Sequence, residues 1–168
     1  MDHQYYIFKI FNKKYRGPLF HSDVLVKGKN KLALVNERYD YEDGGKEIFE
    51  LSGPLGETFK INSVNIYSVF CPLMCSKNIV FFYKSHSCES QAEWFIRQQS
   101  DGTYTIINKK TRQALYCDDA KDERGNRRVQ MGPAKYENDG SDRWIFQLMK
   151  NARKKKKWHN RGWEYESD

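Results

Sequence analysis

Short segments of alternating hydrophobic and polar residues run along most of the chain, and polar stretches rich in Gly, Asp and Asn separate them. The clearest examples are residues 103–108, 114–118, 127–131 and 143–148. Aromatic and β-branched residues at alternate positions are typical of strands, and the separators are typical of turns. Two similar series precede them: residues 6–11, 18–21, 31–36 and 47–51, and residues 58–62, 67–70, 78–83 and 93–97. Because the chain lacks apolar residues at helical spacing with end caps, the pattern predicts an all-β protein.

Three copies of one motif account for these three series. The segments FNKKYRGPLF (11–20) and INKKTRQALY (107–116) align without a gap when Asn12 is placed on Asn108. A middle copy follows when Asn62 is placed on the same position. Self-similarity at a near-constant spacing is the signature of a repeat architecture, in which each copy buries its apolar face against the others.

Two sets of apolar residues occupy equivalent positions in this alignment. We expect them to meet around a pseudo-axis as layers of one core. The sets are Leu19, Val69 and Leu115, and Ile48, Trp94 and Trp144.

Three copies of four strands resemble the β-trefoil, and more narrowly the ricin-B-like trefoils and the trefoil half of insect hemolymph low-molecular-weight lipoproteins. The resemblance rests on the repeats and on phrases such as GTYTIINKKTRQALYCDD (102–119) with a later DRW (142–144). It implies one β-trefoil domain over residues 1–150, with pseudo-threefold repeats at about 5–53, 57–99 and 102–149. Residues 151–168 then form a basic C-terminal tail outside the symmetric unit.

Ricin-like trefoils bind sugars in shallow pockets and carry a Gln-x-Trp signature in the last strand of a repeat. This chain departs from that signature, because the triplets at 46–48, 92–94 and 142–144 all lack the glutamine and only two keep the tryptophan. A sugar pocket needs carboxylates or amides for hydroxyl groups and an aromatic face for the ring. The candidate glycan-binding residues of the third copy are Asp118, Asp119, Tyr136 and Asn138, and those of the first are Asp23, Asn36 and Tyr39. The alternative is that these residues only cap turns.

Charge adds a second candidate surface. The chain has a net charge of +7, and residues 151–168 contribute six Lys or Arg against three Asp or Glu. Such a run suits an anionic partner, because lysines neutralise phosphates and tryptophans stack on unpaired bases. The candidate residues are Arg153, Lys154, Lys155, Lys156, Lys157, Trp158, Arg161 and Trp163. The alternatives are a tail that docks on the barrel, a disordered tail, and a membrane surface.

Other chemistry is not expected. The four histidines are scattered, no Ser or Cys lies in a recognisable nucleophile motif, and the sequence has no Gly-rich phosphate loop. We therefore predict neither catalysis nor a cofactor. Cys71, Cys75, His86 and Cys88 are residue types that bind zinc. A strand over 78–83 would hold the two pairs about 20 Å apart, so we predict buried free thiols and no metal site. Without a leader-like segment, we expect a cytoplasmic or nuclear protein, with export by an unconventional route as the alternative.

These observations together predict a monomeric, non-enzymatic binding module. Its leading partner class is a protein or an acidic polymer, such as a nucleic acid or a sulfated glycan, held by the trefoil loops and the basic tail. A ricin-B-like lectin domain that recognises glycans is the alternative.

Overall fold

The computed structural model describes residues 4–28, 30–38, 46–64, 71–83, 90–133, 139–149, 152–159 and 162–167. The elements within these residues are strands, apart from the three-residue 3₁₀ turn η1 (Ser90–Ala92). None of them is a helix long and apolar enough to cross a membrane. The predicted all-β class is confirmed.

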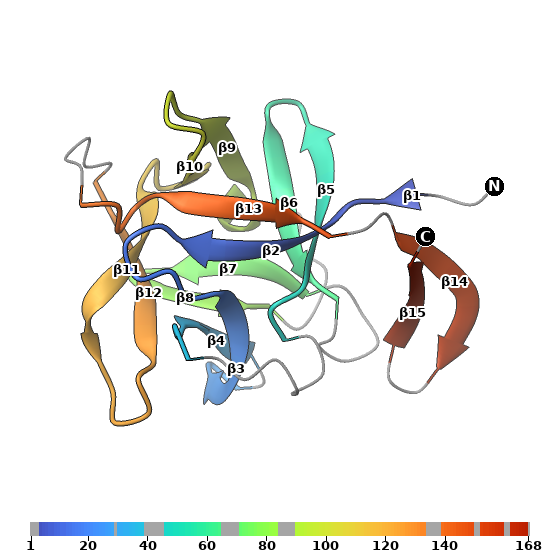
Figure 1. Cartoon of the computed structure of the whole chain (residues 1–168), viewed down its shortest axis with the longest axis horizontal. Coiled ribbons are helices and arrows are strands. Elements are labelled where there is room, and N and C mark those ends of the chain that lie inside the picture. The colour runs from blue at the N-terminus through green and yellow to red at the C-terminus, as the bar shows by residue number, and fades with distance from the viewer. Residues whose placement is uncertain are drawn as a thin grey trace.

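Twelve strands form one sheet that closes on itself into a barrel (Figure 1). The first copy holds β2 (Ile7–Asn12), β3 (Leu19–Val26), β4 (Asn30–Val35) and β5 (Phe49–Leu55). The second copy holds β6 (Thr58–Ser63), β7 (Cys71–Ser76), β8 (Ile79–Phe82) and β9 (Trp94–Gln98). The third copy holds β10 (Tyr104–Asn108), β11 (Ala114–Lys121), β12 (Arg127–Gly132) and β13 (Trp144–Leu148).

The strand pairing repeats three times, as a β-trefoil requires. The last strand of each copy pairs with the first strand of the same copy and with the first strand of the next. At each passage to the next copy a large aromatic residue lies opposite a small polar one. The three pairs are Phe49 with Ser63, Trp94 with Asn108, and Trp144 with Asn12.

This register corrects the sequence alignment by one residue in two places. Ser63, rather than Asn62, occupies the position of the two equivalent asparagines, and Phe49, rather than Ile48, occupies that of the tryptophans. A shift of one residue in a strand turns a side chain to the opposite face. Phe49 is accordingly fully buried in the core, whereas Ile48 is only half-buried.

The middle copy departs from the prediction at its second strand. We expected that strand at residues 67–70, but it lies at Cys71–Ser76. Val69, the predicted core residue, falls outside the described residues. Leu73 takes the corresponding place, since it is fully buried like Leu19 and Leu115. The sequence has more residues between β6 and β7 than between the equivalent strands of the other two copies. Pro72, at the start of β7, is also a residue type that is typical of loops, so the segment did not read as a strand.

Buried tryptophans tie the copies to the core. The Trp94 indole nitrogen donates to the carbonyl of Leu73 at 2.9 Å, and that of Trp144 donates to the carbonyl of Leu115 at 3.0 Å. These equivalent bonds satisfy two buried donors that would otherwise destabilise the barrel. The tryptophan layer predicted from the sequence is therefore present in the second and third copies.

The C-terminal tail forms strands of its own. β14 (Ala152–His159) and β15 (Gly162–Ser167) make a hairpin, and β14 also pairs with the short N-terminal strand β1 (Gln4–Tyr5). This three-stranded sheet is separate from the barrel sheet and lies to one side of it in Figure 1.

Candidate functional site

A β-bulge in the third copy exposes two adjacent carboxylates. Cys117 pairs with Val129 and Lys121 pairs with Arg127, so residues 118–120 of β11 lie opposite a single residue of β12. Such a bulge bends the strand and changes where its side chains point. Asp118 and Asp119, both predicted from the sequence as glycan-binding residues, lie in this bulge.

The neighbouring strand holds Asp118 in place. The Gln130 side-chain amide donates to Asp118 Oδ2 at 3.1 Å, and its carbonyl accepts from the Tyr116 hydroxyl at 2.9 Å. Asp118 is half-buried. Among the described residues its other carboxylate oxygen, Oδ1, has no hydrogen-bond partner. The hydrogen bonds that run from Tyr116 through Gln130 to Asp118 therefore fix one carboxylate oxygen of Asp118 and leave the other available to a ligand.

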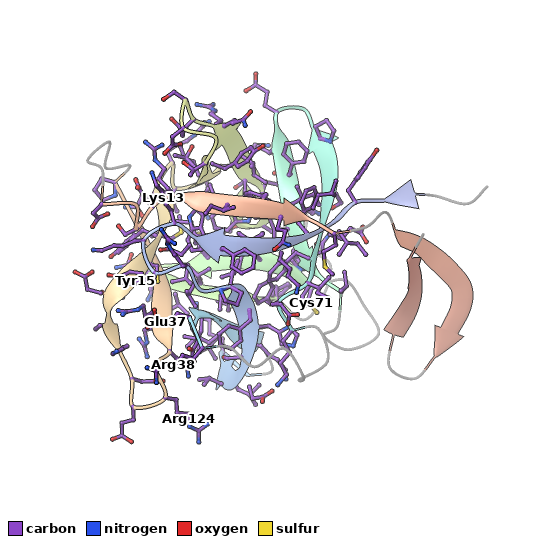
Figure 2. All side chains as sticks on the ribbon, viewed as in Figure 1. Lys13, Tyr15, Glu37, Arg38, Cys71 and Arg124 are labelled. Carbon is purple, nitrogen blue, oxygen red and sulfur yellow. The ribbon has the colours of Figure 1, made fainter. Side chains whose placement is uncertain are left out.

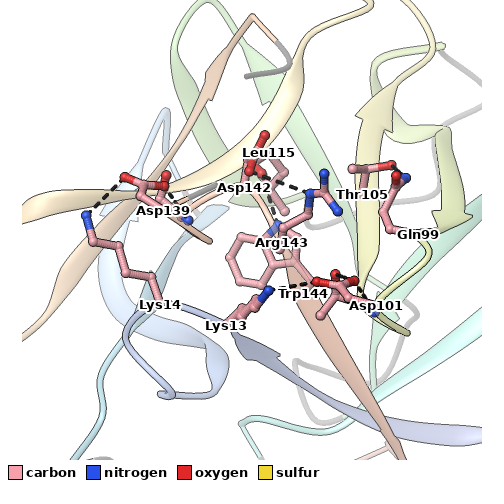
Figure 3. Close-up of polar contacts among 12 residues, drawn as sticks. Lys13, Lys14, Gln99, Asp101, Thr105, Leu115, Asp139, Asp142, Arg143 and Trp144 are labelled. Carbon is pink, nitrogen blue, oxygen red and sulfur yellow. Dashed lines mark hydrogen bonds and ion pairs between the residues drawn. The ribbon is translucent and has the colours of Figure 1, made fainter. Parts of the chain in front are cut away.

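The first copy holds Asp119 in the same manner. Lys14 Nζ lies 3.1 Å from Asp119 Oδ1, and the Tyr15 hydroxyl donates to the same oxygen. Lys14 Nζ also lies 3.0 Å from Asp139 Oδ2, which joins the turn of the first copy to the loop before β13 (Figure 3). Asp119 Oδ2 has no partner in the described part of the chain, and the side chain is 81% exposed.

Local structure explains why Lys14 and Tyr15 reach this place. Asn12 is fully buried, and its Oδ1 accepts the backbone amides of both residues at 3.1 and 3.2 Å. Its amide nitrogen donates to the carbonyl of Ser141 at 2.8 Å. An asparagine that satisfies its own turn in this way fixes the turn's direction.

Arg127 completes the cluster from β12. Its guanidinium lies over the Tyr15 ring, 3.8 Å from the ring centroid, and donates to the backbone carbonyl of Asp119. Cation–π contact of this kind orders both side chains. The ring face covered by Arg127 is therefore not open to a ligand.

These contacts set the ionisation of the cluster. Hydrogen bonds from Tyr15 and Lys14 hold the pKa of Asp119 below its ordinary value, although the nearby Asp139 opposes this. The pKa of Asp139 falls to about 2, chiefly because it accepts the Ser141 backbone amide. Burial, followed by the bond to Asp119, raises the pKa of Tyr15. The aspartates are thus anionic and the phenol neutral over the physiological range.

The equivalent positions of the other copies are closed or missing. In the first copy the same bulge, between His21 and Leu25, presents Asp23, whose two oxygens lie 3.3 Å and 3.0 Å from Lys31 Nζ and Lys46 Nζ. In the second copy β7 and β8 pair without a shift in register over Leu73–Ser76, so no bulge forms there. The third copy alone, among the described strands, presents bulge carboxylates with unengaged oxygens.

Other predicted residues lie elsewhere. Tyr136, Asn138 and Tyr39 are outside the described residues. Asn36 is separate from the Asp23 network, since its amide donates to the carbonyl of Arg124 at 3.1 Å and to Asn126 Oδ1 at 2.9 Å.

Asn36 forms part of a polar hollow of about 180 Å³ between the segment after β4 and the β11–β12 hairpin. The charged residues around it are Glu37, Arg38, Lys121, Asp122, Glu123 and Arg124. Figure 2 shows Glu37, Arg38 and Arg124 on the same side of the molecule as Tyr15. Among the described residues that line it, acids and bases are balanced and no side chain is aromatic.

The predicted tail residues are placed by their backbone. Arg153 and the four lysines, residues 154–157, all lie on β14 with Trp158. Trp158 pairs with Trp163 of β15, and residues 155–157 lie opposite Glu164 alone because the register shifts there. Arg161 is outside the described residues.

The four residues that were weighed as zinc ligands also divide between described and undescribed parts of the chain. Cys71 and Cys75 are buried free thiols, while His86 and Cys88 lie outside the described residues. Burial raises the pKa of Cys75, and it raises that of Cys117 to about 12, so these thiols are protonated and unreactive at neutral pH.

Sequence reasoning missed Lys14, Tyr15, Gln130 and Arg127. A local signal existed for Gln130, which alternates with core residues on β12. Lys14 and Tyr15 come from another copy, and their position beside Asp119 follows only from the pairing of strands between the copies.

Comparisons with protein-family models and with curated protein sequences gave no match. Among solved structures, the chain is similar to the designed three-fold symmetric protein ThreeFoil, with a TM-score of 0.62 and 18% identity over 83% of this chain and 96% of that one. It is similar to the cytolethal distending toxin of Actinobacillus actinomycetemcomitans, with a TM-score of 0.68 and 9% identity over 83% of this chain and 88% of that one.

The chain is also similar to a lectin of Polyporus squamosus bound to the human-type influenza-binding epitope Neu5Aca2-6Galb1-4GlcNAc. The TM-score is 0.68 and the identity 14%, over 90% of this chain and 52% of that one. At such identities the likeness concerns the fold. The chain is a β-trefoil, as the resemblance to ricin-B-like trefoils implied.

Proposed function

We propose that this β-trefoil is a non-enzymatic carbohydrate-binding module whose site is the bulge of the third copy. One observation carries the proposal. Asp118 and Asp119 are adjacent, each has one carboxylate oxygen held by the protein, and the other oxygen has no partner among the described residues.

Two neighbouring anionic acceptors suit two neighbouring hydroxyl groups. A charged acceptor forms a shorter and stronger hydrogen bond with a hydroxyl than a neutral one does. Because Gln130 and Lys14 already fix the carboxylates, a sugar would bind without the entropy cost of ordering them. An exposed, shallow site of this kind gives weak binding.

The comparisons support this function over the protein or acidic-polymer partner favoured by the sequence. One neighbour is a lectin bound to a saccharide epitope, and its fold is shared over most of this chain. Folds host unrelated activities, so the argument rests mainly on the carboxylate geometry.

Replacing Asp118 by Asn tests the proposal. The substitution keeps the size of the side chain and removes its charge, and we expect glycan binding to weaken about tenfold. The measurement is a glycan array followed by calorimetric titration of the best saccharide. Asp23→Asn is the matched control, because Asp23 lies in the equivalent bulge but has both oxygens engaged. If no saccharide binds the wild-type protein, or if both variants behave alike, the assignment is wrong.

The basic hairpin favours a second function, binding of an acidic macromolecule. Arg153 and residues 154–157 are five consecutive cations of one strand, β14. A run of charge of this kind matches a polyanion better than it matches a neutral sugar.

A further inference from the structure

We propose that the cluster of Lys14, Tyr15 and Asp119, built from the first and third copies, makes the bulge site accept neutral saccharides and reject those bearing a carboxylate or sulfate. This inference rests on the carbohydrate-binding function proposed above and names its ligand class.

The cations that reach the site are already engaged by the protein. Lys14 Nζ lies between Asp119 and Asp139, at 3.1 and 3.0 Å. Arg127 stacks on Tyr15 and donates to the backbone of Asp119. An anionic group on a ligand would have to displace one of these contacts before it met a free cation.

The charges around the site also disfavour an anion. Among the described residues that bond to one another in this cluster, three carboxylates, those of Asp118, Asp119 and Asp139, stand against two cations, Lys14 and Arg127. The balance is negative, so a carboxylate or sulfate meets repulsion there. Hydroxyl groups instead meet two acceptor oxygens that have no partner among the described residues.

Lys14 and Tyr15 act through Asp119 and are positioning residues. Both bond the same oxygen, Oδ1, which leaves Oδ2 as the acceptor. They also keep Asp119 ionised, since their hydrogen bonds hold its pKa below the ordinary value. The charge of Asp139 acts in the opposite sense, and Asp118 and Arg127 are the other charged groups of the cluster.

Lys14→Met tests the positioning role, with Lys13→Met as the control. The two lysines are adjacent and the charge change is identical, but Lys13 pairs with Asp101, at 2.7 Å, away from the bulge (Figure 3). We expect Lys14→Met to weaken neutral-glycan binding about three- to tenfold, and Lys13→Met to leave it unchanged. Lys14→Arg should restore most of the affinity. Thermal unfolding of each variant checks that it is folded.

The pH profile separates positioning from a merely structural effect. Binding requires ionised Asp119 and is lost as the pH falls through its folded pKa. Because Lys14→Met removes a contact that lowers this pKa, the loss should begin at a higher pH than in the wild-type protein. A profile that is unchanged in Lys14→Met would overturn the positioning role.

Asp119→Asn tests the charge selectivity. The substitution removes one carboxylate and leaves Lys14 with Asp139 as its one carboxylate partner among the described residues, so the charge of the cluster becomes balanced. On an array of neutral oligosaccharides and their sialylated, uronic-acid and sulfated counterparts, we expect weaker neutral binding and a relative gain for the acidic forms. If wild-type protein prefers the acidic forms, the inference is wrong although the carbohydrate function stands. If wild-type protein binds none of them, the function itself fails.

Discussion

Two fully buried asparagines hold the turns that follow β2 and β10. Asn108 Oδ1 accepts the amides of Lys110 and Thr111 at 3.1 and 3.2 Å, and its Nδ2 donates to the carbonyl of Gln91 at 2.8 Å. Asn12 makes the same three kinds of bond in the first copy. Each amide therefore satisfies backbone groups of two segments that are distant in sequence.

Replacing Asn108 by Ala should destabilise the protein by about 2–3 kcal/mol, because it leaves buried backbone groups without partners. Thr111→Ala is the control. Its hydroxyl accepts the exposed amide of Gln113, at 3.3 Å, and makes a weak bond with the thiol of Cys75, so its removal should cost less than about 1 kcal/mol. Urea unfolding followed by tryptophan fluorescence measures both. Equal losses in the two variants would show that the buried amide does not hold the turn.

The middle copy has a different residue at this position. Ser63 occupies the asparagine position, and its hydroxyl lies 3.0 Å from His21 Nδ1. Burial, helped by Lys31 and Lys46, lowers the pKa of His21 to about 3. The imidazole is therefore neutral at physiological pH and acts as a core residue.

At the scale of elements, the sequence predicted the strands better than their register. Repeated phrases located the first and last strands of each copy, because aromatic residues mark them. They misplaced β7 and shifted two correspondences by one residue, since Asn62 and Ile48 resemble the expected residue types while Ser63 and Phe49 occupy the positions. A sequence alignment matches residue types, whereas the pairing between strands decides which face of the sheet each side chain points to.

The candidate site shows the same limit. Asp118 and Asp119 were predicted because a single turn-rich segment carries both. Lys14 and Tyr15 lie 105 and 104 positions away from Asp119 in the sequence. Contacts between copies depend on how the strands pair when the barrel closes. A pattern within a short stretch of sequence does not determine that pairing.

The basic hairpin is an element with a prediction of its own. Deleting residues 151–168 should abolish salt-sensitive binding to a polyanion and leave saccharide binding unchanged. If five cations neutralise five phosphates of single-stranded DNA, the logarithm of affinity should fall with the logarithm of salt with a slope of about −3.5. Fluorescence anisotropy at several salt concentrations measures it. A variant with residues 154–157 changed to Gln keeps the chain length as a control, and binding that survives in it would contradict the role of the lysines.

At the scale of the whole molecule, three similar copies carry unequal sites. Asp23 of the first copy is held by two lysines, and the second copy has no bulge between β7 and β8. Pseudo-threefold symmetry therefore describes the core, where Leu19, Leu73 and Leu115 are equivalent, and does not extend to the binding surface. A symmetric fold needs its symmetry only where the copies pack together.

This asymmetry predicts one saccharide per chain. Calorimetric titration should give a stoichiometry close to one, and Asp118→Asn should weaken the whole of that single phase about tenfold instead of affecting only a fraction of the sites. A chain with one binding site should not agglutinate saccharide-coated beads, because a protein molecule must have at least two binding sites to link two beads. Chemically linked dimers of the same chain should agglutinate them, which controls for the display of the saccharide. A stoichiometry near two or three would mean that Asp23 exchanges its lysine partners for ligand hydroxyls, or that the second copy binds without a bulge.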